Sequence, residues 1–141
     1  MAHITRNHSK LTLEGARALL AAAQRRAEEI RVPMDIAIVD GGGRLLVFER
    51  MEGAKPSSIA ISILKARSAA LRRAPTGPAM SEDRVNLPTA LGLAITAPDY
   101  QTPVRGRLPL IVDGEVVGAI GVSAGTEDQD PDVARAVLEK V

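Results

Sequence analysis

Residues 108–122 read LPLIVDGEVVGAIGV, and this stretch decides the fold. Two runs of aliphatic and β-branched residues flank the pair Asp113-Gly114. An Asp-Gly pair in that position is typical of a type I′ turn, because both central residues of such a turn need positive φ. The pattern predicts a β-hairpin with strands over 108–112 and 115–122, and therefore an antiparallel sheet.

A second hairpin is predicted nearer the start of the chain. Its strands are expected over 34–40 and 44–50, on either side of the glycine loop 41–43, since β-rich runs that flank such a loop form hairpins. A further strand is expected over 91–96. Residues 81–91 are ambiguous and are compatible with a short helical turn.

The first helix is predicted by apolar spacing. From Leu13 to Ile30 the apolar residues recur at alternating steps of three and four, which gives one face of an α-helix. Thr12 suits the N-cap, and Pro33 ends the helix because the residue before proline is pushed out of the α region. A helix is therefore expected over 13–31.

Two later helices complete the predicted order. One is expected to start from a cap at Ser57 or Ser58 and to end in Arg72 and Arg73; the other is expected to follow the cap Asp130. In the order α-β-β-α-β-β-β-α, strands follow one another directly and can pair as hairpins. This order predicts an α+β fold whose antiparallel sheet carries helix 13–31 on one face.

The composition narrows the class of protein. The chain has 141 residues, which is the size of one domain, and we expect a single domain over 1–141 with an N-terminal arm over 1–10. A net charge of +1 gives no broad field to attract nucleic acid or a membrane. There is no cysteine, so disulfides and thiolate sites are excluded. Without a signal-like start or a long apolar run, a cytoplasmic protein is expected.

Three stretches together resemble the GlcG/HbpS family, which is often labelled haem-degrading and also occurs as the C-terminal domain of PduO-type proteins. They are LTLEGA at 11–16, then IVDGGG at 38–43 with RMEGA at 50–54 and KAR at 65–67, and finally residues 108–123 with DQD at 128–130. The resemblance implies a profilin-like fold with a five-stranded antiparallel sheet flanked by helices. It also implies a homo-oligomer, for which an even number of subunits is expected.

The chain departs from the family pattern in two places. The family usually carries Pro-Gly-Gly before the Leu-Pro-Leu strand, whereas this chain has Arg105-Gly106-Arg107. Both of its histidines, His3 and His8, lie in the first eight residues. The first departure introduces two cations into a loop, and the second confines every imidazole to the arm.

Asp40 stands where a predicted strand meets the glycines. One interpretation makes it a general base beside a pocket in which Gly41 and Gly42 let a ligand approach the backbone. The other makes it the acceptor of an Asx-turn, whose carboxylate binds backbone N–H groups. The sequence leaves both interpretations open.

The loop Arg105-Gly106-Arg107 is the most distinctive candidate for ligand binding. Two guanidinium groups suit a carboxylate or phosphate through bidentate hydrogen bonds. We expect this loop to meet Asp40 at one end of the sheet. The alternative is a pair of solvated loop arginines. Ser123 on the last strand is a further ligand-binding candidate, but no histidine lies near it in sequence to form a triad.

Arg50 and Lys65 are cations close to otherwise apolar elements. Arg50 is a ligand-binding candidate and Lys65 a candidate for proton transfer. Because Lys65 and Arg67 lie two apart on one helix, they cannot both face one site. The alternative for these residues is a solvated charge or an ion pair with Glu49, Glu52 or Asp40.

His3 and His8 are candidate ligands of a haem iron, since imidazole is a common haem ligand. The alternative is an arm with no metal role.

The sequence is compatible with three functions. The family resemblance implies a small-ligand-binding protein, with haem or another tetrapyrrole as the ligand. A second hypothesis is a cofactor-independent isomerase, tautomerase or hydrolase acting on a small anionic carboxylate, in which the arginines bind the carboxylate and Asp40 or Lys65 moves a proton. A third is a structural or sensory oligomer without chemistry of its own. No nucleic-acid or membrane partner is expected.

Overall fold

The computed structural model describes residues 3–74, 80–81, 84–98 and 105–141. Its main sheet has the strand order β2-β1-β6-β5, and every neighbouring pair is antiparallel. The α+β class is therefore confirmed. The strands are β1 (Asp35–Asp40), β2 (Leu45–Arg50), β5 (Arg107–Val112) and β6 (Glu115–Ser123).

The expectation of five strands in the sheet is wrong. Residues 91–96, predicted as a strand, belong to helix α3 (Leu87–Thr96). The side chain of Asn86 accepts a hydrogen bond from the Thr89 N–H, and Pro88 stands in the first turn, so the helix starts before the apolar run. A short apolar run has no readable period, so these residues by themselves do not distinguish a strand from a helix. Just before it, β3 (Met80–Ser81) pairs with β4 (Arg84–Val85).

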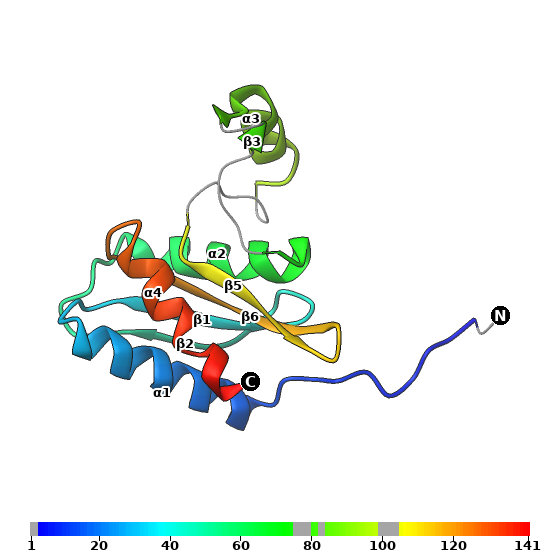
Figure 1. The fold of residues 1–141 in the computed structure, drawn as a ribbon, viewed down its shortest axis with the longest axis horizontal. Helices are drawn as coiled ribbons and strands as arrows, with labels where there is room; N and C mark the ends of the chain where they lie inside the picture. The colour runs from blue at the N-terminus through cyan, green and yellow to red at the C-terminus, as the bar shows by residue number, and fades with distance from the viewer. Residues whose placement is uncertain (1–2, 75–79, 82–83, 99–104) are drawn as a thin grey trace.

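Helices cover both faces of the sheet (Figure 1). One face carries α1 (Leu13–Glu29) and α4 (Gln129–Arg135), which is followed by the 3₁₀ turn η1 (Leu138–Lys140). The other face carries α2 (Ser58–Arg72). The predicted position of the first helix on one face is thus confirmed.

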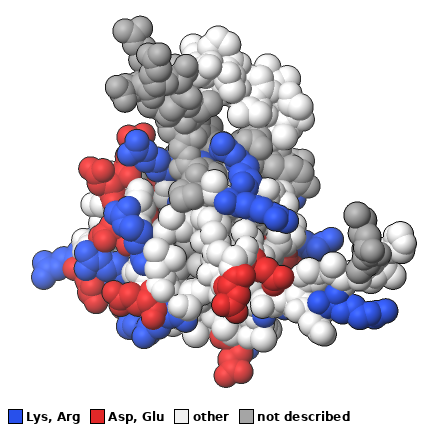
Figure 2. Space-filling model, turned by 45° about the vertical axis from the view of Figure 1, so that its right-hand side comes forward, with Lys and Arg blue, Asp and Glu red and all other residues white. Residues whose placement is uncertain are grey.

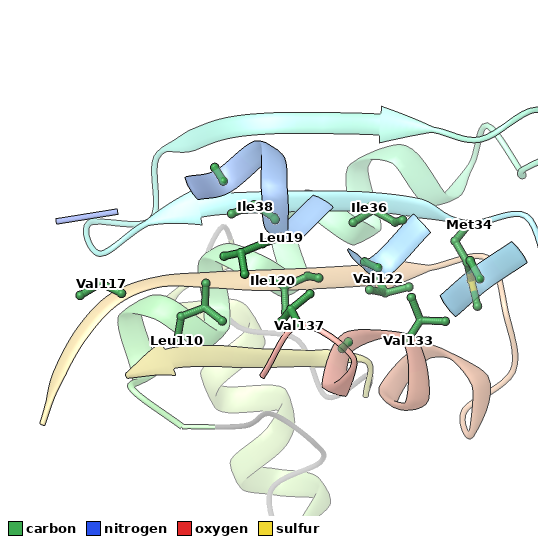
Figure 3. Close-up of a cluster of buried hydrophobic side chains, with 14 residues drawn as sticks. Leu19, Met34, Ile36, Ile38, Leu110, Val117, Ile120, Val122, Val133 and Val137 are labelled. Carbon is green, nitrogen blue, oxygen red and sulfur yellow. The ribbon is translucent and has the colours of Figure 1, made fainter. Parts of the chain in front are cut away.

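The larger core lies between the sheet and α1 with α4 (Figure 3). Along β1, Ile36 and Ile38 point into this core, while Ala37 and Val39 point toward α2, as the two-residue repeat of a strand requires. The core residues are aliphatic, and the labelled ones in Figure 3 are Leu19, Met34, Ile36, Ile38, Leu110, Val117, Ile120, Val122, Val133 and Val137.

The core under α2 is built from small residues. A Cβ atom on Gly121 of β6 would overlap the backbone carbonyl oxygen of Ser62, and it would lie 2.5 Å from the backbone nitrogen of Ala66. The helix backbone therefore rests directly on the strand at this point. Glycine within a strand often marks such a close backbone approach, and here the element that approaches is α2.

Helix boundaries follow their caps. Thr12 accepts a hydrogen bond from the Gly15 N–H at 2.9 Å, as predicted, and α1 ends at Glu29 rather than at 31. The last helix differs more from its prediction, which placed the cap at Asp130, because α4 already starts at Gln129. Asp130 is therefore inside the helix and not its cap. Its side chain turns inward, with consequences for the site described below.

Candidate functional site

The carboxylate of Asp40 stabilises the first hairpin. Its Oδ1 accepts hydrogen bonds from the backbone N–H groups of Gly42 and Arg44, both at 2.9 Å. A Cβ atom on Gly41 would lie 2.6 Å from the carbonyl oxygen of Val116, so this glycine permits close contact with β6. The geometry is that of an Asx-turn, the structural one of the two interpretations of Asp40.

His8 approaches the same hairpin from the arm. Together with Ser9 and Lys10 it lines a cavity of about 260 Å³ against residues 40–42 and Val117. The Nδ1 atom of His8 lies 3.1 Å from Oε1 of Glu115, and its Nε2 lies 2.8 Å from the Thr5 hydroxyl. The pKa of Glu115 is lowered, first by the hydrogen bond from the Ser9 N–H and then by His8. Thus His8 is oriented, whereas His3 is exposed.

The loop Arg105-Gly106-Arg107 lies at the other end of the sheet. In the strand register Asp40 stands opposite Gly118, at one end of the sheet. Arg107 stands opposite Gly121, near the other end, where Asp35 faces Ser123. A single chain therefore does not bring the Asp40 loop and the arginine loop together. The physical reason is that the loop after β1 and the loop before β5 leave the antiparallel sheet at opposite ends.

Lys65 forms a buried ion pair that the sequence did not predict. Its Nζ donates to the carboxylate of Asp130 at 2.9 Å and to the carbonyl oxygen of Val122 at 2.7 Å. The other carboxylate oxygen of Asp130 accepts the Gly125 N–H at 2.9 Å. The alternative of a solvated Lys65, or of a pair with Glu49, Glu52 or Asp40, is wrong, because α2 directs this side chain into the protein.

Burial dominates the electrostatics of Lys65. Its ammonium is removed from water, which lowers its pKa; Asp130 acts in the opposite direction, and the positive charge of Arg107 lowers the pKa further. Lys65 is fully buried, whereas Arg67, two residues further along the same helix, is only half-buried.

Gly106 brings the arginine loop against this ion pair. A Cβ atom on Gly106 would lie 2.5 Å from the Cβ of Asp130 and 3.0 Å from the Nζ of Lys65. Its φ is +107°, a conformation that favours glycine. Its carbonyl oxygen accepts the Val122 N–H at 2.8 Å, which ties the loop to the end of β6. No other residue type fits here without displacing its neighbours.

Arg107 is buried and Arg105 is exposed. The side chain of Arg107 is only 2% exposed, and burial together with the nearby positive charge of Arg72 lowers its pKa to about 9. Both arginines line a cavity of about 340 Å³. The remaining lining residues come from the loop after β6 and from α4: Glu127, Asp128, Pro131 and Arg135, together with Gly106 and Leu108 of the arginine loop and β5.

Asp35 is a buried carboxylate that the sequence reasoning missed. It is fully buried at the start of β1, between Arg50 of β2 and Ser123 of β6 in the register. Neither of its carboxylate oxygens has a hydrogen-bond partner among the described residues. Burial raises its pKa, and the charge of Arg50 opposes that shift. An acidic residue at the first position of an otherwise apolar strand was the available signal.

An apolar cavity lies at the Asp40 end of the molecule, on the α1 face. It has a volume of about 320 Å³. Its lining is mostly aliphatic, with Lys10 and Lys140 among the polar members; the aliphatic side chains are Leu11, Leu19, Leu110, Val112, Val117 and Val141. His8 precedes two of the lining residues, Ser9 and Lys10.

A larger groove, of about 470 Å³, runs between α1 and α4. Three of its charged side chains pair with one another, since Arg26 binds Glu29 at 2.9 Å and Asp132 at 3.0 Å. We therefore do not assign it a ligand. Over the described parts of the chain, no group of three His, Asp or Glu side chains could hold a metal ion, and no helix could cross a membrane.

Comparison with known proteins identifies the relatives of this chain. The family model described as "Haem degrading protein HbpS-like" matches residues 11–139. The protein GlcG of Escherichia coli K12 is 40% identical over 113 residues, which cover 80% of this chain and 81% of GlcG.

Two solved structures share the fold over nearly the whole chain. The Klebsiella pneumoniae protein ORFY is 31% identical with a TM-score of 0.86, and the alignment covers 99% of this chain and 95% of ORFY. The PduOC–haem complex is 26% identical with a TM-score of 0.82, over 94% of this chain and 96% of PduOC.

Proposed function

Since the chain belongs to the HbpS-like family, we propose that it is a small-ligand-binding protein whose ligand is haem or a related tetrapyrrole. A structural relative, PduOC, has been crystallised with haem. The site that we propose is the apolar cavity between the start of α1 and strands β5 and β6. The observation that carries the proposal is the combination in that cavity of an aliphatic lining with two lysines.

The residues at this cavity suit the parts of a haem molecule. Partly exposed aliphatic side chains such as Leu11 and Val112 match the apolar macrocycle, and the ammonium groups of Lys10 and Lys140 match the two propionates. The imidazole of His8, in the neighbouring cavity, is the candidate ligand of the iron. Bound haem would supply an iron centre for electron transfer or for binding of a small molecule.

The chain's own contribution is binding and orientation. Glu115 accepts from the imidazole of His8 at Nδ1, which orients the ring. The other ring nitrogen, Nε2, lies 2.8 Å from the Thr5 hydroxyl, and a bound iron would replace that contact. The aliphatic lining excludes water from one side of the ligand, and the lysines fix the direction of its charged edge.

Titration of the purified protein with haem tests this proposal. We expect the wild type to give a Soret band that saturates as haem is added. In His8→Ala we expect a changed band position and weaker binding, whereas His3→Ala should behave as the wild type does. Lys10→Glu is expected to weaken binding, because it places a negative charge beside a propionate, while Lys55→Glu in an exposed loop is its matched control. A Soret band that is the same in all five proteins, or no band at all, would contradict this site.

We also propose that the protein assembles with copies of itself through α3. The ten residues of this helix, LPTALGLAIT, include no charged side chain, and none of them is buried. Leu87, Leu91 and Ile95 are 60%, 54% and 79% exposed and recur every four residues along one side. The helix stands away from the sheet at the top of the molecule (Figure 1), and the top of the space-filling view includes a white patch, the colour of residues other than Lys, Arg, Asp and Glu (Figure 2).

A helix that is apolar on all sides is normally buried. The family resemblance implies a homo-oligomer, and a second copy of this chain offers α3 an equally uncharged helix in a symmetric contact. We therefore take α3 of a second copy as the occupant.

A further inference from the structure

The sheet has two edge strands, β2 and β5, and they differ in what they offer a partner. The carbonyl oxygen of Gly106 points toward β6, so Pro109, three residues later, directs its backbone outward. Proline has no N–H, and the outer edge of β5 therefore lacks a donor there. β2 reads LLVFER and contains neither proline nor lysine, the residues that commonly protect an edge. No described residue pairs with β2 on the side away from β1.

Two residues of β2 direct their backbone groups to this open edge. The N–H of Met51 donates to Met34, on the β1 side, so Phe48, three residues earlier, faces outward. At the other end of the strand the carbonyl oxygen of Arg44 points toward β1, which turns Leu45 outward. The free N–H and C=O groups of Leu45 and Phe48 are therefore available for pairing with another strand.

A bulge puts the side chains of these two residues on the same face of the sheet. The register of β2 against β1 shifts between Ile38 and Val39. Leu45 consequently lies opposite Val39 and Phe48 opposite Ala37, both of which belong to the core under α2. A regular strand would place residues three apart on opposite faces. Leu45 is 48% exposed, because α2 lies over the other strands of the sheet and barely reaches β2.

We propose that β2 pairs with β2 of a second copy, antiparallel about a two-fold axis, with Leu45 of each copy opposite Phe48 of the other. This register matches the outward backbone groups of both strands and brings apolar side chains together on the α2 face. It joins two four-stranded sheets into one continuous sheet. The contact is separate from the contact through α3 and does not depend on it.

The same register also pairs opposite charges. It places Arg44 of each copy opposite Glu49 of the other, on the α1 face, where Glu49 lies beside Ile36. Arg44 is exposed, and neither side chain forms an ion pair within the described part of the chain. A two-fold axis centred on Glu49 would match outward residues too, Phe48 with Arg50. It would set two carboxylates opposite each other, which is unfavourable. Charge complementarity therefore selects the first register.

Cysteine cross-linking tests both the contact and its register, since the chain has no cysteine of its own. Arg44→Cys and Glu49→Cys are prepared separately and also co-expressed. In the mixed pair the two thiols lie directly opposite each other, and the second Arg44–Glu49 contact remains intact. Within a pair of identical variants the two thiols are five residues apart, roughly 17 Å along the strands, too far for a disulfide.

We expect a band of twice the monomer mass on a non-reducing gel for the co-expressed variants, and not for either variant alone. The same band is expected when both chains also carry Leu91→Glu, so that loss of the α3 contact is distinguished from loss of the β2 contact. No cross-link in the mixture, or cross-linking of either single variant to the same extent, would overturn the proposal.

Charge reversal gives an independent readout. Arg44→Glu is expected to lower the mass of the assembly at least twofold in light scattering, because carboxylates then face each other at both contacts. Adding Glu49→Arg exchanges the two charges and is expected to restore the wild-type mass. Arg25→Glu, at an exposed residue on the α4 side of α1, is the control and should keep that mass. An unchanged mass in Arg44→Glu, or a double variant that is folded by circular dichroism but does not reassemble, would count against the β2 contact.

Discussion

The ammonium group of Lys65 lies 2.9 Å from the carboxylate of Asp130, and both side chains are buried where α2, the end of β6 and α4 meet. The two residues are 65 positions apart in the chain. Their contact joins helices on opposite faces of the sheet, and it forms the support against which the arginine loop is packed.

Loss of either partner of this pair is expected to be strongly destabilising. Lys65→Met leaves the buried carboxylate without its cation, and Asp130→Asn leaves the buried ammonium without its anion, so each should cost about 3–5 kcal/mol in the free energy of unfolding. The double variant should cost less than the sum, since no lone charge remains. Urea denaturation measures all three. Arg26→Ala, which removes two ion pairs at a partly exposed side chain, should change stability far less. Strict additivity would show that the contact is not energetically coupled.

Asp35 is expected to make the stability of the protein fall as the pH rises. Its folded-state pKa is raised by burial, so the folded protein holds the proton more tightly than the unfolded chain. Ionisation of Asp35 therefore begins to lower the free energy of unfolding above the ordinary pKa of 3.8. The loss of stability is complete once the pH exceeds the raised pKa of the folded protein. Asp35→Asn should be more stable than the wild type at neutral pH and should lose this advantage in acid. Thermal unfolding at a series of pH values measures it; an Asn variant that is less stable at neutral pH would contradict the account.

Gly121→Ala is expected to destabilise the protein by about 1–3 kcal/mol or more, because the new methyl group overlaps the backbone of α2 and has no room to move. Gly92→Ala is the matched control. Nothing lies within 4 Å of a Cβ atom at Gly92, and alanine is the better helix former, so this change should be neutral or stabilising by about 0.5–1 kcal/mol. If both variants lost a comparable amount of free energy of unfolding, the close contact of α2 with β6 would be refuted.

Leu91→Glu is expected to reduce the mass of the assembly. It places a charge at the centre of the uncharged α3, so burying that helix against a second copy becomes unfavourable. Light scattering coupled to gel filtration measures the mass. Leu138→Glu introduces the same charge at another exposed leucine and should leave the assembly intact. A wild-type monomer at micromolar concentration, or an unchanged mass in Leu91→Glu, would rule out this interface.

Local patterns in the sequence were sufficient for the hairpins and the first helix. The Asp113-Gly114 pair needs positive φ, and both residues have it, with φ of 50° and 78°. The apolar spacing of α1 extends over several turns, long enough for its period to be read. The resemblance to the HbpS-like family was also evident from sequence motifs, and the family match confirms it.

Tertiary structure decided what the candidate residues do. Residues 91–96 are too few to reveal a period, and the cap at Asn86 makes them helical. The partner of Lys65 lies far along the chain, so no local pattern points to it. The sequence by itself determined the α+β class, because the strands come in hairpins whose turns and apolar patterns are local. Only the tertiary structure put Arg107 at the opposite end of the sheet from Asp40, because the strand register separates them, and brought His8 of the arm to Asp40, because the arm is bonded to Glu115.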